Sequence, residues 1–107
     1  MKQIKVKNKM IVDDSTAFII AEMAWSHDGS KENGKKIIRA ASDAKADAIK
    51  FHLTSLADYM VPQYGSGKGR VSAGKEERRI YDYLESINLD RKAWEELFAY
   101  AKGLGLS

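Results

Sequence analysis

Two charged side chains, Glu22 and Lys50, stand at the ends of apolar segments, where they could bind or react with a ligand. Glu22 comes directly after the apolar run 18–21, and Lys50 lies in the segment 46–51. Carboxylates are rarely buried unless they are paired, so Glu22 is expected where its strand opens onto a site. A lysine at a strand end is a natural point charge for a phosphate or carboxylate. The structural alternatives are an ion pair between these two side chains, or a Glu22 that turns into solvent.

The two histidines, His27 and His52, follow the same two segments. A specific metal site needs three or four ligands, so this pair alone does not predict one. A hydrogen-bonded structural role is commoner for a lone histidine near a strand end. The glycine-rich stretch 65–70 does not fit a phosphate loop, because Pro62 and Gly69 stand where that motif needs a glycine and a hydroxyl. We expect a flexible basic lid there.

The composition argues against several classes of protein. The chain of 107 residues has 18 basic and 15 acidic side chains, and its net charge of +3 is too mild for the concentrated basic face that nucleic acid requires. There is no cysteine, so disulfides and thiolate metal sites are excluded. No apolar run approaches membrane-spanning length. We therefore expect a cytoplasmic protein that binds neither nucleic acid nor a membrane; nucleic-acid binding through the basic stretch 64–79 is an alternative.

The elements that must position these residues are predicted from hydrophobic periodicity. Residues 1–12 alternate and predict a small hairpin. The run 18–23 predicts a strand buried on both faces, and 46–51 predicts a second such strand. Ser30 is the expected N-cap of a helix between them, with one apolar stripe formed by Ile37, Ile38, Ala41 and Ala44. Strand, helix and strand make a βαβ unit, so the two strands should be parallel and should bring Glu22 and Lys50 together.

The second half of the chain predicts a long irregular segment and two more helices. Residues 55–75 are rich in glycine, and 76–84 predicts a short helix. Asp90 should cap the last helix, with Leu89 and Trp94 as a hydrophobic staple and Gly103 as its left-handed stop. Its expected buried stripe is Trp94, Leu97, Phe98 and Ala101. Residues 104–107 should begin a third strand. Two strands and two helices cannot bury all their apolar faces, so the pattern is that of the opening third of a larger repetitive α/β protein.

Three motifs in order resemble the N-terminal part of the sialic acid synthase family. They are the apolar strand ending in Ala21-Glu22, the turn His27-Asp28-Gly29 and the segment Ala46-Asp47-Ala48-Ile49-Lys50-Phe51. The family comprises N-acetylneuraminate, pseudaminic and legionaminic acid synthases and the related spore-coat polysaccharide proteins. The resemblance covers nearly all 107 residues, including the stretch 58–62 and the last helix.

The resemblance implies an α/β fold that is the N-terminal part of a (β/α)8 TIM barrel. The hairpin would occupy 1–12 and the first two βα units 18–107. It also implies a transferase that condenses phosphoenolpyruvate with an N-acetylated amino sugar, such as N-acetylmannosamine, to give a sialic-acid-type nonulosonate. A divalent metal, Mn or Mg, would assist, with ligands outside this chain, and the full-length enzyme would be a homodimer.

The same match assigns roles to four residues. Glu22 would contact the sugar and act as the catalytic group, and Lys50 would bind phosphoenolpyruvate. His27 and His52 would belong to the substrate-binding set, His27 through its position in the turn. The chain departs from the family where Trp25-Ser26 replaces Gly-x-Asn-like residues and where His52-Leu53 replaces the usual Gln-Thr. Lys45 stands where a helix-stop glycine is usual.

We expect the isolated chain to be inactive, and either to associate through its open strand edges or to be loosely packed. A non-catalytic binding or assembly module that kept the βαβ unit is the alternative function. Its distinguishing mark would be a Glu22 buried against Lys50 with no accessible pocket. The identity of the sugar does not follow from the sequence.

Overall fold

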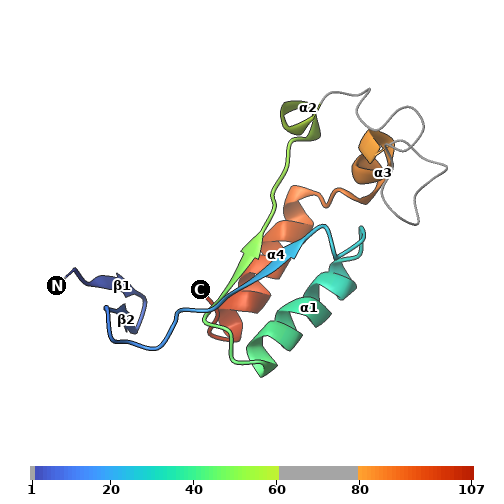
Figure 1. The fold of residues 1–107 in the computed structure, drawn as a ribbon. Coiled ribbons are helices and arrows are strands. Elements are labelled where there is room, and N and C mark those ends of the chain that lie inside the picture. Colours follow the sequence, from blue (N-terminus) through green and yellow to red (C-terminus); the bar gives the residue numbers. More distant parts are fainter. Residues whose placement is uncertain (1, 61–79) are drawn as a thin grey trace.

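The computed structural model describes residues 2–60 and 80–107 and has an α/β arrangement (Figure 1). Its elements, in chain order, are β1 (Ile4–Val6), β2 (Lys9–Ile11), β3 (Ile20–Ala24), α1 (Lys31–Asp43), β4 (Ala48–Phe51), α2 (Leu56–Tyr59), α3 (Ile80–Ile87) and α4 (Arg91–Gly103). In Figure 1, α1 and α4 run beside the β3–β4 pair, and α2 and α3 lie beyond the ends of the strands. Among the described helices, none is long and apolar enough to cross a bilayer.

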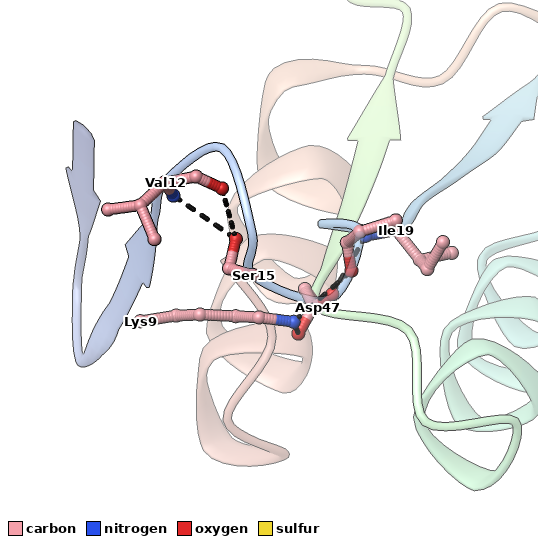
Figure 2. A network of polar contacts seen from close by, with 6 residues as sticks. Lys9, Val12, Ser15, Ile19 and Asp47 are labelled. Atoms are coloured by element: carbon pink, nitrogen blue, oxygen red, sulfur yellow. Dashed lines mark hydrogen bonds and ion pairs between the residues drawn. The ribbon is translucent and has the colours of Figure 1, made fainter. Parts of the chain in front are cut away.

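The predicted hairpin is confirmed: β1 and β2 pair antiparallel, with Val6 opposite Lys9. A polar network joins it to the β3–β4 pair (Figure 2). Lys9 Nζ lies 2.9 Å from Asp47 Oδ1, and Asp47 Oδ2 accepts the Ile19 N–H at 2.7 Å. These bonds, that from Ile19 first and that from Lys9 second, lower the pKa of the Asp47 carboxyl. The hairpin is therefore attached at the amino ends of the two strands.

The predicted βαβ unit is also confirmed. β3 and β4 are parallel, with Ile20 opposite Ala48 and Glu22 opposite Lys50, and α1 connects them. α1 and α4 cover one face of this pair. The buried residues between the layers are Met23, Ile38, Ala41, Ile49, Trp94, Leu97, Ala101 and Leu106. Apolar area removed from water stabilises such a layer by about 25 cal/mol per Å².

The prediction that the strand at 18–23 is buried on both faces is wrong. Ile19 is 53% exposed and Ile20 is 58% exposed. Side chains alternate along a strand, so Met23 enters the core while Ile20 and Glu22 occupy the opposite face. None of the described helices packs on that face, because α1 and α4 both lie on the other one. The apolar run is therefore a two-faced strand with one open side.

α1 begins as predicted, because the Ser30 hydroxyl accepts the Asn33 N–H at 3.1 Å. Ile38 and Ala41 are buried, but Ala44 is exposed, so the predicted stripe is one position too long. The third buried residue of α1 is Gly34. A Cβ added at Gly34 would lie 3.0 Å from two Leu97 methyl carbons. The missing side chain lets α1 and α4 approach closely.

The two long helices end in the same way. After α1, Lys45 has φ +62°, and the Ala46 N–H donates to the Ala41 carbonyl at 3.0 Å. After α4, Gly105 has φ +81°, and the Leu106 N–H donates to the Ala101 carbonyl at 3.1 Å. Both are Schellman motifs. The non-glycine residue expected at the first stop is confirmed.

Two details of the last helix differ from prediction. Its cap is confirmed, since Asp90 Oδ1 accepts the Ala93 N–H at 2.8 Å. The left-handed residue that follows the helix is Gly105, and not Gly103 as predicted. Gly103 is the last residue of α4, so the helix ends two residues later than expected. Phe98 was expected in the core but is 50% exposed, since it lies toward the uncovered edge of β4, against Phe51.

The chain begins to pair with the free edge of β4 at its last residue. The Ser107 N–H donates to the Asp47 carbonyl and the Ile49 N–H donates to the Ser107 carbonyl, both at 3.1 Å. One residue bonded to two alternate residues of its neighbour is the pattern of a parallel ladder. The expected start of a third strand is confirmed in its hydrogen bonding.

The segment 55–75, which is rich in glycine and was expected to be irregular, contains a short helix near its beginning. Leu56–Tyr59 form α2, and Leu56 packs with Leu84 and Ile87 of α3 in a second small core. The helix predicted over 76–84 is Ile80–Ile87 among the described residues. Residues 61–79, which include the glycine-rich stretch and the rejected phosphate loop, lie outside the described residues.

Candidate functional site

The parallel register places Glu22 and Lys50 side by side on the open face of the sheet. They are direct partners across β3 and β4; Glu22 is the central residue of β3, and Lys50 is the next to last residue of β4, near its carboxyl end. His52 follows Lys50 by two residues, so it continues on the same side of the chain. In α/β proteins this end of the sheet is where ligands bind. The structure thus brings three of the four predicted site residues together.

Each carboxylate oxygen of Glu22 faces a different base. Lys50 Nζ lies 3.6 Å from Oε2, and His52 Nε2 lies 3.0 Å from Oε1. The side chains of Lys50 and Glu22 are 58% and 49% exposed, and that of His52 is 29% exposed. The expected ion pair is present, but it is open to solvent. A ligand can therefore reach the lysine and the carboxylate, and the buried pair that would mark a non-catalytic module is not what the described residues form.

A bulge interrupts the pairing immediately after Glu22, and the pairing resumes with Ala24 opposite Phe51. The register shifts between Glu22 and Ala24, so Met23 is the extra residue, and Ala24 has φ +47°. A bulge with a left-handed residue bends its strand and re-aims the neighbouring side chains, and such bulges are common beside active sites. Met23 enters the core and Glu22 remains on the open face by the ordinary alternation of the strand, and the bulge lies directly beside Glu22.

His27 does not join this group, because it is fully buried in the turn after β3. Its ring meets that of Trp94 edge-on at 5.4 Å, and Trp25 lies 6.0 Å away. Burial lowers the pKa of His27, against a smaller opposing effect of Asp28. The Gly29 N–H donates to Nδ1 at 3.1 Å, so in the neutral ring the proton is on Nε2. Its substrate-binding role remains a prediction.

The described residues do not fit a resident divalent metal. They contain no group of three or more His, Cys, Asp or Glu side chains that could hold a metal ion. Glu22 and His52 together supply two candidate ligands, fewer than a specific site needs.

Contacts that the sequence did not predict brace the turns around the site. The Tyr83 hydroxyl of α3 donates to Asp28, in the turn after β3. Asn88 Nδ2 donates to the Thr54 carbonyl at 2.9 Å, in the segment after β4. Tyr83 is half-buried. A tyrosine or asparagine near a helix end was the only signal, and it does not identify a partner.

Another groove lies between two helix ends. It has a volume of about 650 Å³ and runs between the N-terminal ends of α1 and α4, with Ser30, Lys31, Asp90 and Glu96 in its lining. Lys31 Nζ and Glu96 Oε2 are 2.8 Å apart, which raises the pKa of the lysine and lowers that of the carboxyl. The Lys31–Glu96 pair is tighter and less exposed than the 3.6 Å pair of Lys50 with Glu22, so the open face of the sheet offers its charges more readily to a ligand and is the better candidate site.

Comparison with known proteins gives a consistent set of relatives. A family model described as the NeuB family matches residues 37–107. The spore coat polysaccharide biosynthesis protein SpsE of Bacillus subtilis is 35% identical over 89 residues, which is 83% of this chain and 23% of that protein. A pseudaminic acid synthase of Campylobacter jejuni is 32% identical over 94 residues, 87% of this chain and 27% of that protein.

The fold has the same kind of relative. The crystal structure of an N-acetylneuraminic acid synthetase from Leptospira borgpetersenii matches 98% of this chain with a TM-score of 0.72 and 23% identity. The match covers 32% of that structure. This chain therefore spans about a quarter to a third of the length of the relatives it matches. At this identity the structural likeness supports the fold alone.

Proposed function

Since this chain belongs to the NeuB family, we propose that it forms the N-terminal part of a synthase that condenses phosphoenolpyruvate with an N-acetylated amino sugar. Its curated relatives include a pseudaminic acid synthase and an N,N'-diacetyllegionaminic acid synthase, so the product would be a sialic-acid-type nonulosonate. The full protein would be a transferase built on a (β/α)8 barrel. The observation that carries the proposal is the Glu22–Lys50 pair on the open face of the sheet.

In this proposal Lys50 binds the anionic end of phosphoenolpyruvate. Its side chain is 58% exposed, and its ammonium lies at a longer distance from Glu22 than a tight hydrogen bond requires, so an incoming phosphate or carboxylate can compete for it. Positive charge at this point would also stabilise the negative charge that develops during the reaction.

Glu22 is proposed to contact the amino sugar at the reacting centre. The phosphoenolpyruvate C3 attacks the aldehyde carbon, and the aldehyde oxygen becomes an alkoxide that needs one proton. Water then adds at C2, and phosphate leaves. A carboxyl group at the strand end could supply the proton for the first step. His27, buried beneath Trp94, would act on the substrate only through the turn that it supports.

Three properties of the whole protein belong to the same proposal. A divalent metal, Mn or Mg, would be bound by residues outside this chain, the full-length enzyme would be a homodimer, and the enzyme would work in the cytoplasm. The metal would supply Lewis-acid stabilisation of the carbonyl oxygen. The isolated 107-residue chain would bind substrate weakly and would not turn it over.

Calorimetric titration of this chain with phosphoenolpyruvate tests the proposal. We expect Lys50→Ala to weaken binding about tenfold, since loss of one charge contact of this kind is worth about 1 kcal/mol or more. Lys36→Ala is the matched control, because Lys36 is an exposed lysine on α1, on the other side of the sheet. Equal affinities in the wild type and Lys50→Ala would remove Lys50 from the site.

A further inference from the structure

His52 stands within hydrogen-bonding distance of the proposed catalytic carboxylate. Its Nε2 is 3.0 Å from Glu22 Oε1, shorter than the 3.6 Å between Lys50 Nζ and the other oxygen. His52 is also the least exposed of the three, at 29% of its side chain. The imidazole is thus the closer partner of Glu22, and its side chain is partly shielded from water and partly open to it.

An imidazole at this position differs chemically from the amide of a glutamine in the same place. Both side chains donate an N–H to a carboxylate and can hold it in one orientation. A glutamine, however, never gives up its proton, whereas an imidazole normally exchanges one between pH 5 and 8. A histidine therefore keeps the hydrogen bond and adds a titratable group next to Glu22.

We propose that His52 is a positioning residue that holds Glu22 and supplies it with a proton, and so makes this face pH-dependent. The inference rests on the proposed function. Glu22 enters this step as the carboxylate that pairs with Lys50. When the carbon–carbon bond forms, the Nε2 proton of the His52 imidazolium passes through the Glu22 carboxylate to the alkoxide, and the imidazole regains one proton from solvent. One proton thus passes from water to the new hydroxyl group, and no other reactant is needed.

The charge of the face follows from the same exchange. The charged groups around His52 come from both strands, Glu22 from β3 and Lys50 from β4. With a neutral imidazole their charges cancel, and with an imidazolium the net charge is +1. An anion such as phosphoenolpyruvate should bind the protonated form more tightly.

The first test uses the ligand-free chain. The ¹³C resonance of the Glu22 side-chain carboxyl is followed between pH 5 and 8, where we expect a step that reports the neighbouring imidazole. His52→Gln is the matched variant, because it keeps a donor but cannot titrate, and it should abolish the step. The other histidine, His27, is buried beside Trp94, and His27→Gln should leave the step in place. A step that persists in His52→Gln would overturn the proposal.

The second test compares phosphoenolpyruvate affinities of the wild type and His52→Gln at pH 5.5 and pH 8. The ratio of the two affinities should fall about fivefold across this range, and the titration of the ligand itself cancels in the ratio. A constant ratio would overturn the inference while leaving the Lys50 effect intact. Loss of all binding, with the carboxyl step still dependent on His52, would reject the proposed function and retain the His52–Glu22 coupling. An amide ¹H–¹⁵N spectrum checks that each variant is folded, and His52→Asn replaces His52→Gln if it is not.

Discussion

The two faces of the β3–β4 pair differ in almost every physical respect. One is covered by α1 and α4, and its Met23, Ile38 and Leu97 are completely buried. The other carries Glu22, Lys50 and the 58% exposed Ile20. Residues that alternate along one strand thus belong to two environments, one dry and apolar and one wet and charged.

The helix-covered face therefore accounts for most of the stability, and the open face carries the candidate site. Buried apolar contacts on the helix side supply the stability, since each buried large side chain contributes about 1.5–3 kcal/mol. The charged contacts on the open side are partly solvated, and exposed ion pairs contribute at most about 1 kcal/mol. Substitutions on the covered face should therefore change the free energy of unfolding, and substitutions on the open face should change ligand binding. Single variants can test this expectation.

The largest effect is expected from Leu97→Ala, which removes a fully buried side chain from the helix-covered face. We expect a loss of about 3 kcal/mol in the free energy of unfolding, measured by urea titration and circular dichroism. The adjacent Phe98 is 50% exposed and provides the control, so Phe98→Ala should cost about 1 kcal/mol or less. Equal losses of unfolding free energy in the two variants would show that burial on the helix-covered face does not determine the stability.

Acidification should weaken the same face through His27. Burial lowers the pKa of this histidine in the fold, so the unfolded chain binds more protons between the folded value and about 6.5. The stability it contributes is complete above that pH and is lost as the pH falls through the folded pKa. Urea titrations from pH 7.5 to 5 should show this decline, and His27→Gln should flatten it. A decline of unchanged slope in the variant would assign the effect to other groups.

A smaller effect is expected at the ends of the two helices that build the covered face. Lys45 and Gly105 occupy equivalent left-handed positions. Lys45→Gly should raise the free energy of unfolding by about 1 kcal/mol, because a side chain is strained there. Gly105→Ala should lower it by about as much, and an added Cβ meets nothing within 4 Å, so the cost is conformational alone. Thermal melts of the pair measure both, and changes of the same sign would exclude this explanation.

The smallest change in stability is expected on the open face. Glu22→Gln removes the charge from a carboxylate that is about half exposed, and should alter the free energy of unfolding by less than about 0.5 kcal/mol. Phosphoenolpyruvate titration of the same variant should nevertheless show altered heat. If the free energy of unfolding of the variant fell by more than about 1 kcal/mol, the open face would also contribute substantially to stability. The proposed difference between the two faces would then be wrong.

Much of the local structure could be predicted from particular residues. Ser30 and Asp90 are short polar side chains before amphipathic stretches, and both cap helices. The alternation in residues 1–12 is a local pattern, and it became the hairpin. The failures have a common origin. Whether Ala44, Phe98 and the outer side of β3 are covered depends on neighbouring elements, and a residue's type does not reveal which neighbours it has.

Apart from α2, the sequence by itself determined which of the described segments become strands and helices, and that Glu22 and Lys50 stand on neighbouring parallel strands. These follow from periodicity and from the geometry of a βαβ unit, both of which are short-range. Only the tertiary structure decided which face remains open, that His27 is buried, and that His52 contacts Glu22 at 3.0 Å. Those outcomes depend on the register of two strands and on where α1 and α4 pack, which are set by contacts between residues distant in the chain.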